Sequence, residues 1–493
     1  MRNTFSKGLI GVKYDDFLTS FTGDGNTPAE IVANPARLIP IGRKDDEMAL
    51  TSVFLASLPL IVEFRNVISE TMKLSKARKI YCFTEVSFPV LFSEDKAKAN
   101  ARFDGLAIVV SAGTIKDAAI FEMKSGSDEL NQTQIELYVD MAHSLAVTKF
   151  MSVTNQFVPS ESIYPIPLNI PRKNKDVALF HSSWKRIRTI ASILVQKNNL
   201  NIEDSDQVSI MKEVLRYMDD CGSIRSFDKM RKEWKEVVAD LGSSSGALNS
   251  KLKEFYPLII QDWLQEERDI AIDLTEQLSE HEYTPVFADS KKSPSMNELI
   301  KNSIPLLRDQ RKLCSSFKIK NAVSNLSLTA DLMAKNIMQS MTVQVPQDKN
   351  TKTKLNYVRG FFKKSEKANP EAFSLIKENI QVNLILKRKQ EILKFPLVDF
   401  MDADKTNIDK ALEIAKVDVC FETNLKKSDF ESSSKFISIM ENAVSKFYSV
   451  VMQYFEKWVP TTPKTSNNPV SAEATLKDKQ EVETDENDEQ GVN

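Results

Sequence analysis

The chain has 493 residues, of which 42% are hydrophobic and 27% are charged, as is typical of a globular protein. At about 100–200 residues per domain, this length predicts two to four domains. The 66 Lys and Arg against 68 Asp and Glu leave a formal charge of −2, which by itself gives no indication of a nucleic-acid partner. A disulfide framework and the usual zinc and iron–sulfur spacings are excluded, because no CxxC pair occurs among the four widely separated cysteines, Cys82, Cys221, Cys314 and Cys420.

The first 40 residues are predicted to be an N-terminal extension. Residues 1–21 carry scattered charge and no apolar h-region, so we expect no secretory signal. The most apolar stretch, residues 48–62, is too short to cross a bilayer and contains Pro59. We therefore expect a soluble, cytoplasmic protein without membrane contact.

An α/β pattern follows this extension. Residues 45–69 carry apolar residues at helical spacing, with Asp45 or Asp46 placed to cap the helix. Segments rich in β-branched and aromatic residues predict three successive strands at 79–88, 102–111 and 117–124. An amphipathic helix at 130–147 and a strand at 149–158 come next. The order helix, three strands, helix, strand predicts a mixed sheet flanked by helices.

The C-terminal part of the chain has a different pattern of predicted secondary structure. It is first mainly helical, with candidate linkers at 242–246 (GSSSG) and 288–295. Strand-like runs (NAVSNLSLTA, NIMQSMTVQV and IQVNLIL) and a long helix at 433–458 then predict an α+β module. We therefore predict an α/β domain at residues 41–183 and a helical region at 184–313. An α+β module at 314–459 and a tail at 460–493 follow.

The tail is predicted to be disordered and acidic, because it has few apolar residues to bury. From residue 471 onward it holds eight acidic residues and two lysines, which leaves about +4 on the rest of the chain. It is either a plain solvated tail or a weak mimic of nucleic acid. The near-neutral total charge is therefore no evidence against DNA binding.

Polar residues interrupt the apolar strands of the first domain. Asp104 lies in the second strand, and Glu122 and Lys124 lie two apart in the third, so they point to the same face. A carboxylate is costly to bury without a partner. Two carboxylates on adjacent strands therefore need a cation, and oxygen ligands suit Mg²⁺ or Mn²⁺. A lysine beside such a metal can orient the water that attacks a phosphodiester.

At these positions the sequence resembles the PD-(D/E)XK nuclease superfamily. Asp104 followed 18 positions later by Glu122-Met-Lys124 is similar to its D…(D/E)xK signature, although a phenylalanine replaces the proline. Gln134-Ile-Glu-Leu-Tyr138, on the next helix, is similar to the QxxxY element of RecB-like members. The element order α–β–β–β–α–β is also that of the family core. The resemblance covers about a quarter of the chain.

This resemblance implies a restriction-endonuclease-like core and a Mg²⁺- or Mn²⁺-dependent nuclease. Asp104 and Glu122 would hold the metal, and Lys124 would position or activate water. Gln134 and Tyr138 would orient the scissile strand. DNA is the implied substrate, because the superfamily acts mostly on DNA. Large additions to such a core recur in bacterial restriction and anti-phage proteins, which implies a role in antiviral defence.

We also expect a homo-oligomer. No GxxxxGK[ST] motif occurs, so an ATPase or defence-system partner would be a separate protein. Two alternatives to the nuclease remain. One is a catalytically degenerate nuclease-fold protein that acts as a nucleic-acid-binding or assembly scaffold. The other is an unrelated α/β protein with a chance motif.

The residues of the predicted nuclease signature could instead have purely structural roles. Asp104 and Glu122 could be edge-strand carboxylates that Lys124 or Arg102 neutralises. Tyr138, at helical spacing, could belong to the core.

Two more glutamates are candidate metal ligands. Glu47 could extend the site from the first helix, or simply favour the start of that helix. Glu85 is either a third acidic ligand or an exposed residue. The histidines, His143, His181 and His281, lack metal-ligand spacing and are expected to be structural.

A basic stretch at 349–367 (KNTKTKLNYVRGFFKKSEK) holds seven basic residues with aromatic residues between them. Cations hold phosphates and aromatic rings stack bases, so Arg359, Lys363 and Lys364 are predicted to bind nucleic acid. The alternative is a solvated helix face that Phe361 and Phe362 anchor in the core.

Overall fold

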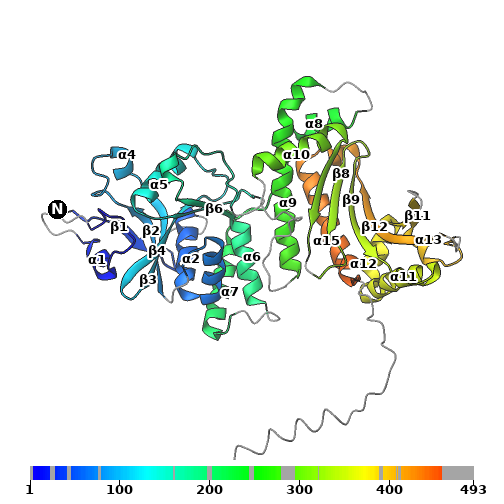
Figure 1. Ribbon diagram of the computed structural model, residues 1–493, viewed down its shortest axis with the longest axis horizontal. Coiled ribbons are helices and arrows are strands. Elements are labelled where there is room, and N and C mark those ends of the chain that lie inside the picture. The colour runs from blue at the N-terminus through cyan, green and yellow to red at the C-terminus, as the bar shows by residue number, and fades with distance from the viewer. Residues whose placement is uncertain are drawn as a thin grey trace, which may run out of the picture.

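Two six-stranded β-sheets with helices packed against them form the computed structural model of the chain (Figure 1). The predicted tail, Asp45, and most of the two predicted linkers lie outside the described residues. The structure describes residues 4–22, 28–40, 46–75, 79–158, 162–196, 202–243, 249–278, 295–319, 321–387, 392–406, 408 and 412–457.

The first sheet is mixed, as the sequence predicts. Its strands are β1 (Val32–Pro35), β2 (Lys79–Ser87), β3 (Phe103–Ser111), β4 (Thr114–Met123), β5 (Lys149–Thr154) and β6 (Ala178–Ser183), and they lie in that order in the sheet. Neighbours are antiparallel from β1 to β4 and parallel from β4 to β6. Because β1 pairs with β2, part of the predicted N-terminal extension belongs to this sheet.

Helices cover both faces of the first sheet. They are α1 (Tyr14–Thr19), α2 (Glu47–Leu60), α3 (Val62–Thr71), α4 (Lys96–Ala99), α5 (Gln132–Ser144), α6 (Trp184–Val195) and α7 (Ser205–Asp220). Alternate residues of β3 enter two cores: Ala107 and Val109 pack with α2, α3, α6 and α7, whereas Leu106 and Ile108 pack with α1 and α5. A strand buried on both faces explains the nearly continuous apolar run of β3.

The predicted helix at 45–69 is two helices, α2 and α3, bent by 109° where they meet. Ile61 between them is extended, with φ −123° and ψ 106°. Asp46 caps α2 as predicted, because its carboxylate accepts a 3.2 Å hydrogen bond from Met48 N. Within the described ranges no single helix is long and apolar enough to cross a membrane, and α2 with α3 meets that test only as this bent pair.

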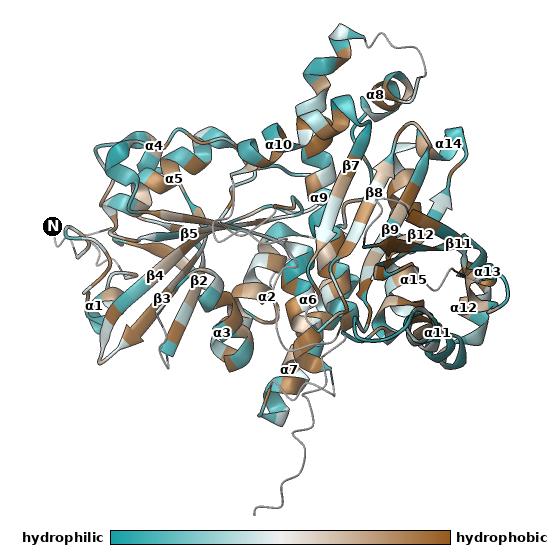
Figure 2. Ribbon diagram, turned by 45° about the vertical axis from the view of Figure 1, so that its right-hand side comes forward, coloured by the Kyte–Doolittle hydropathy of each residue, from teal (hydrophilic) through white to brown (hydrophobic). Residues whose placement is uncertain are grey.

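The second sheet is antiparallel throughout. It contains β7 (Lys312–Phe317), β8 (Leu326–Asp331), β9 (Asn336–Gln344), β10 (Ile380–Leu386), β11 (Ile392–Pro396) and β12 (Ile414–Asn424), in the order β11-β10-β12-β9-β8-β7. Side chains alternate between buried and partly buried along β8, β9 and β10, so one face packs on helices. Figure 2 shows the resulting hydrophobic strands and inward helix faces in brown.

The predicted helical region at 184–313 divides between the two cores. α6 and α7 pack on the first sheet, and the helices from α8 onward pack on the second. We call the first sheet with its helices the first body, and the second sheet with its helices the second body. The two bodies meet where α6 and α9 lie in contact (Figure 1). The second-body helices are α8 (Trp234–Leu241), α9 (Tyr256–Leu278), α10 (Met296–Asp309), α11 (Thr351–Ala368), α12 (Pro370–Ile376), α13 (Leu397–Met401), α14 (Lys427–Phe430) and α15 (Ser433–Val450).

Candidate active site

Strands β3 and β4 bring the two predicted metal ligands face to face. Their register pairs Gly105 with Phe121, so Asp104 and Glu122, the next residues along the two antiparallel strands, lie opposite each other. Alternate residues of both strands enter the core formed with α5, and the two carboxylates share that side of the sheet.

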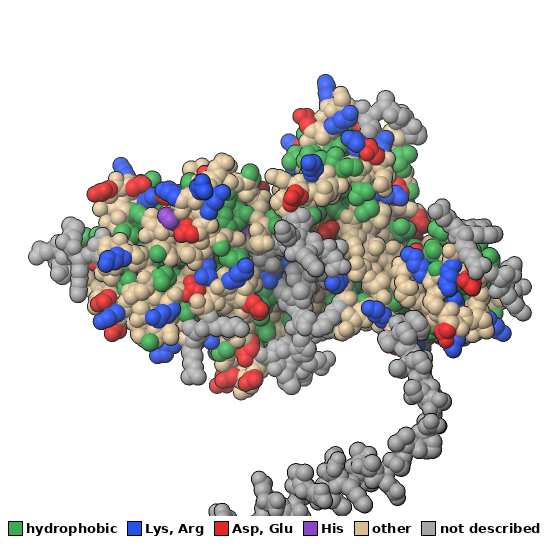
Figure 3. All heavy atoms as spheres, viewed as in Figure 1, with side chains coloured by type: hydrophobic (Ala, Val, Ile, Leu, Met, Phe, Trp, Pro, Cys, Tyr) green, Lys and Arg blue, Asp and Glu red, His purple; other side chains and the backbone are tan. Residues whose placement is uncertain are grey.

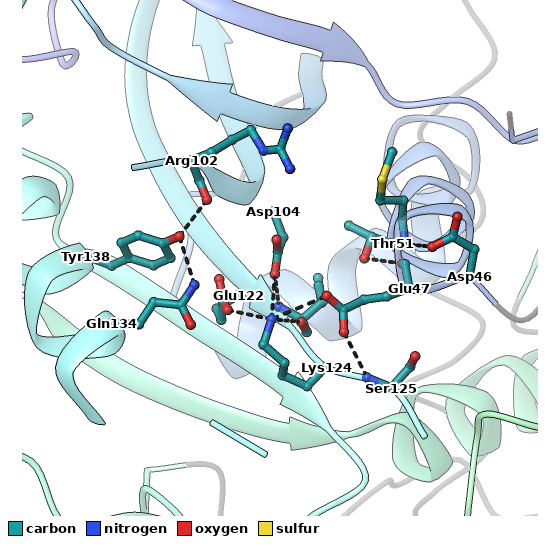
Figure 4. A network of polar contacts seen from close by, with 12 residues as sticks. Asp46, Glu47, Thr51, Arg102, Asp104, Glu122, Lys124, Ser125, Gln134 and Tyr138 are labelled. Carbon is teal, nitrogen blue, oxygen red and sulfur yellow. Dashed lines mark hydrogen bonds and ion pairs between the residues drawn. The ribbon is translucent and has the colours of Figure 1, made fainter. Parts of the chain in front are cut away.

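Lys124 lies at the centre of a cluster of acidic side chains (Figure 4). Its Nζ is 2.7 Å from Glu122 Oε1 and 3.6 Å from Asp104 Oδ2. The same nitrogen is 3.3 Å from Glu47 Oε1. Asp104 Oδ2 in turn accepts a 2.7 Å hydrogen bond from Met123 N. The three residues of the predicted signature are therefore brought together, and Glu47 joins them.

Glu47 reaches the cluster from the first turn of α2. Its Oε2 lies 3.2 Å from Ser125 N, which donates a hydrogen bond to it just beyond the end of β4. Burial raises the pKa of Glu47, although Lys124 opposes this effect. Glu47 is thus a member of the acidic cluster in addition to beginning its helix.

Glu122 is the most enclosed member, with 0% of its surface exposed. Burial and the neighbouring Asp104 raise its pKa to about 9. Lys124 is close enough to form an ion pair, yet neither oxygen of Glu122 accepts a well-aligned hydrogen bond from any described residue. Burial opposes the charge on Lys124, but Glu122 and Asp104 outweigh that effect and raise its pKa.

The chemistry of this donor set suits a hard divalent cation, although the ligand oxygens of Asp104, Glu122 and Glu47 do not all lie within 4.8 Å of one another. Asp104, Glu122 and Glu47 supply three carboxylates against the single ammonium of Lys124, so the cluster carries excess negative charge in a partly buried place. The two oxygens of Glu122 have the free acceptor capacity that a metal ligand needs. Oxygen donors of this kind suit Mg²⁺ or Mn²⁺.

Tyr138 lies in the core, with its hydroxyl bonded at the start of β3. It is 4% exposed and packs edge-on against Phe103, with ring centroids 4.9 Å apart. Its hydroxyl donates a 2.6 Å hydrogen bond to Arg102 O and accepts one of 3.0 Å from Gln134 Nε2. Tyr138 is thus buried in the core, as its alternative interpretation had it, and its predicted role in orienting the scissile strand stays a prediction. The Gln134–Tyr138 pair holds the backbone where β3 begins, two residues before Asp104 (Figure 4).

Glu85 is neither an exposed residue nor a free ligand. It is part-buried and forms a 2.7 Å ion pair with Arg102, whose own side chain is 60% exposed. Its φ of +57° marks an irregularity in β2, where the pairing with β1 also shifts register. Arg102 therefore pairs with Glu85, whereas Lys124 pairs with Asp104 and Glu122.

The predicted nucleic-acid-binding residues lie on α11 and do not form one surface. Arg359 is 7% exposed, and its guanidinium donates to Phe400 O and Asn356 Oδ1, so its assignment to nucleic-acid binding is wrong. Lys363 and Lys364 are exposed, and Lys364 pairs with Glu456 at 2.8 Å. On the face drawn in Figure 3, basic and acidic side chains are interspersed over both bodies.

The described histidines have structural partners, as expected. His181, on β6, lies 2.8 Å from Ser152 Oγ and 2.9 Å from Gln156 O. His143 pairs with Asp176 at 2.9 Å. His281 lies outside the described residues.

Sequence reasoning missed a second acidic cluster, which joins α9 to α15. Among the described residues, Glu266, Asp269 and Glu441 are the only set of three whose ligand atoms all lie within 4.8 Å of one another. Two of them lie one turn apart among the buried residues of α9, a signal that could have been read from the sequence, but the third comes from a helix far along the chain.

Comparison of the chain with protein-family models, with curated proteins and with solved structures finds no match.

Proposed function

We propose that the first body is a Mg²⁺-dependent nuclease that hydrolyses DNA phosphodiester bonds. One observation carries the proposal: Asp104, Glu122 and Lys124 converge from two adjacent strands, and Glu122 is fully buried without an aligned hydrogen bond. Three acids around one ammonium are a costly arrangement unless they bind a cation.

The topology of the first sheet supports the proposal. α2 precedes the antiparallel strands β2, β3 and β4, α5 follows, and β5 then pairs parallel with β4. This is the α–β–β–β–α–β order that the resemblance to PD-(D/E)XK nucleases implies, with the acidic residues on its second and third strands. A restriction-endonuclease-like core is therefore part of the proposal.

Asp104 and Glu122 would hold the metal, and Glu47 would lie beside them, because the ligand oxygens of the three residues do not all lie within 4.8 Å of one another. When bound, such a metal polarises a phosphoryl oxygen and lowers the pKa of coordinated water. Lys124 holds a proton on Nζ between the carboxylates, in a position to bind attacking water and to offset charge developing on the phosphate. Met123 N fixes the orientation of Asp104.

Gln134 and Tyr138 act as positioning residues in this scheme. Their hydrogen bonds hold the carbonyl of Arg102, and through it the backbone that carries Asp104. Arg102, largely exposed beside the cluster, is available to contact a phosphate while paired with Glu85. DNA rather than RNA, and a role in bacterial antiviral defence, follow from the family resemblance.

The experiment compares cleavage of supercoiled plasmid, linear duplex, single-stranded DNA and RNA in Mg²⁺, Mn²⁺ and EDTA. Glu122→Gln and Lys124→Ala should each lower the cleavage rate by about 10²-fold or more. Asp176→Asn, an exposed carboxylate outside the cluster, is the matched control and should cleave like the wild type.

Cleavage that persists in both cluster variants would show a contaminant or a different site and would refute the assignment. DNA binding without cleavage by the metal-loaded wild type would instead support the scaffold alternative.

A further inference from the structure

The second acidic cluster lies where the two bodies meet. Glu266 and Asp269 belong to α9, Glu441 belongs to α15, and α9 contacts both α15 and the first-body helix α6 (Figure 1). One ligand oxygen from each residue lies within 4.8 Å of those of the other two. Glu266 and Asp269 are fully buried, and Glu441 is part-buried.

Charge in this cluster is unbalanced. Asp273, one turn beyond Asp269, adds a fourth carboxylate. Lys185 of α6 pairs with both, at 2.5 Å from Asp269 Oδ1 and 2.7 Å from Asp273 Oδ1. The neighbouring Arg188 is engaged by Glu276 at 2.9 Å. Four carboxylates against one ammonium leave excess negative charge in a partly buried place, which is unfavourable without a further cation.

Glu266 gives an independent indication of a ligand. It is 0% exposed, and both of its carboxylate oxygens lack a hydrogen bond from any described residue. Nearly all buried polar atoms in folded proteins are paired, so an exception needs an explanation. The unpartnered oxygens belong to a side chain that reaches the oxygens of Asp269 and Glu441.

We propose that Glu266, Asp269 and Glu441 bind a hard divalent cation, and that Ca²⁺ fits them best. All donors are carboxylate oxygens, which such cations prefer. Oxygen ligands lie at ~2.3–2.6 Å from Ca²⁺ and at ~2.0–2.1 Å from Mg²⁺. An enclosed set of three carboxylates matches Ca²⁺ better, because Mg²⁺ is usually bound by one or two carboxylates and keeps several waters. Phe227 N holds Asp269 Oδ2 at 2.7 Å and leaves Oδ1 toward Lys185.

Two neighbouring hollows open onto the Glu441 side of this site, whereas Glu266 and Asp269 line neither of them. One has a volume of about 490 Å³ and the other about 410 Å³, and Asp273 and Glu441 line both. They place solvent beside Glu441, the outer member of the cluster, on the side where water ligands would complete the coordination of a cation.

Protons are the alternative way to balance this charge. Burial, together with the neighbouring acids, raises the pKa of Glu441 to about 7 and that of Asp269 to about 6. If protons alone compensate the cluster, it binds no metal and its stability does not respond to Ca²⁺. Metal binding and proton sharing therefore make opposite predictions.

The test uses the full-length protein and titrates Ca²⁺ by calorimetry, with thermal melting in EDTA and in Ca²⁺. Glu122→Gln serves as the background, because it removes a ligand from the first site. In that background, Glu266→Gln and Glu441→Gln should each weaken Ca²⁺ binding by about tenfold or more, since ligand charge sets affinity. Glu441→Gln, at a part-buried position, serves if Glu266→Gln does not fold.

Thermal melting distinguishes a metal ligand from a carboxyl that has only a structural role. In EDTA the Glu266→Gln variant should melt no lower than its background, because it removes buried charge. Ca²⁺ should raise the melting temperature of the background and not that of the variant. Identical melting of the background in EDTA and saturating Ca²⁺, or unchanged Ca²⁺ affinity in both variants, would overturn the proposal. The result is independent of nuclease activity.

Discussion

Replacing Glu122 by Gln should stabilise the metal-free protein while it removes nuclease activity. Glu122 is fully buried, and burial together with Asp104 raises its pKa to about 9. Glutamine has nearly the same shape and no charge. Glutamine does not have to take up a proton on folding, as a carboxyl with this pKa does at neutral pH, and Lys124 keeps Asp104 and Glu47 as partners.

The size of this effect follows from proton linkage. A carboxyl whose pKa is higher in the folded state than in the unfolded state contributes stability that is fully present below the unfolded value, here 4.5. That contribution is lost as the pH rises toward the folded value of about 9. At ~1.4 kcal/mol per pH unit, the loss between pH 4.5 and pH 7 is about 3 kcal/mol.

Urea unfolding in EDTA at pH 5, 7 and 8.5 measures this loss of stability. Hydrogen exchange of the β4 amides then measures it locally, at the strand that carries Glu122. The wild type should lose stability across this range, and Glu122→Gln should lose less, exceeding the wild type at pH 7 by up to about 3 kcal/mol. Mg²⁺ should stabilise the wild type more than the variant. Asp176→Asn controls for charge removal in general. A Glu122→Gln protein less stable than the wild type at pH 8.5 in EDTA would refute the reasoning.

Three further predictions concern the same fold. Tyr138→Phe should cost about 1–2 kcal/mol, because a carbonyl at the start of β3 loses its donor, and should lower the cleavage rate with little change in DNA affinity, as melting and steady-state kinetics can measure. Arg359→Met should lower the melting temperature and leave the salt dependence of DNA binding unchanged, because Arg359 is buried. Replacing Lys363 and Lys364 by Glu should weaken DNA binding and make its affinity less dependent on salt, as a filter-binding assay can measure. Because a metal ligand must lose its proton, the apparent affinity for Mg²⁺ should rise with pH toward the pKa of Glu122, and an activity titration showing tighter Mg²⁺ at pH 6 than at pH 8 would contradict this.

The sequence predicted the first sheet well where burial is continuous. β3 carries a nearly continuous apolar run because helices cover both faces, and β2 and β4 are rich in β-branched and aromatic residues, so all three are readable without tertiary information. β1 and β11 are short, with mostly exposed or part-buried residues, so they carry no such signal. The same applies to the break at Ile61, which separates two helices within one apolar stretch.

Site residues were predictable where the chemistry lies within one supersecondary unit. Asp104, Glu122 and Lys124 come from neighbouring strands, so a two-residue spacing was enough to place them on one face. Arg359 was misassigned because its charge was considered without its position in the helix. It follows Leu355 by four residues and precedes Phe362 by three, which places it on the buried face.

A single turn of α6 connects the two acidic clusters. Trp184 Nε1 donates a 2.8 Å hydrogen bond to Lys124 O, and the next residue, Lys185, pairs with Asp269 and Asp273. A cation among the carboxylates of α9 would compete with Lys185 for Asp269. Trp184 is fully buried and packs edge-on against Phe54 of α2, so the start of α6 is fixed by its core side chain, not by Lys185 alone. The first cluster should therefore keep its geometry when Lys185 loses a partner, because the packing that orients Lys124 lies within the first body.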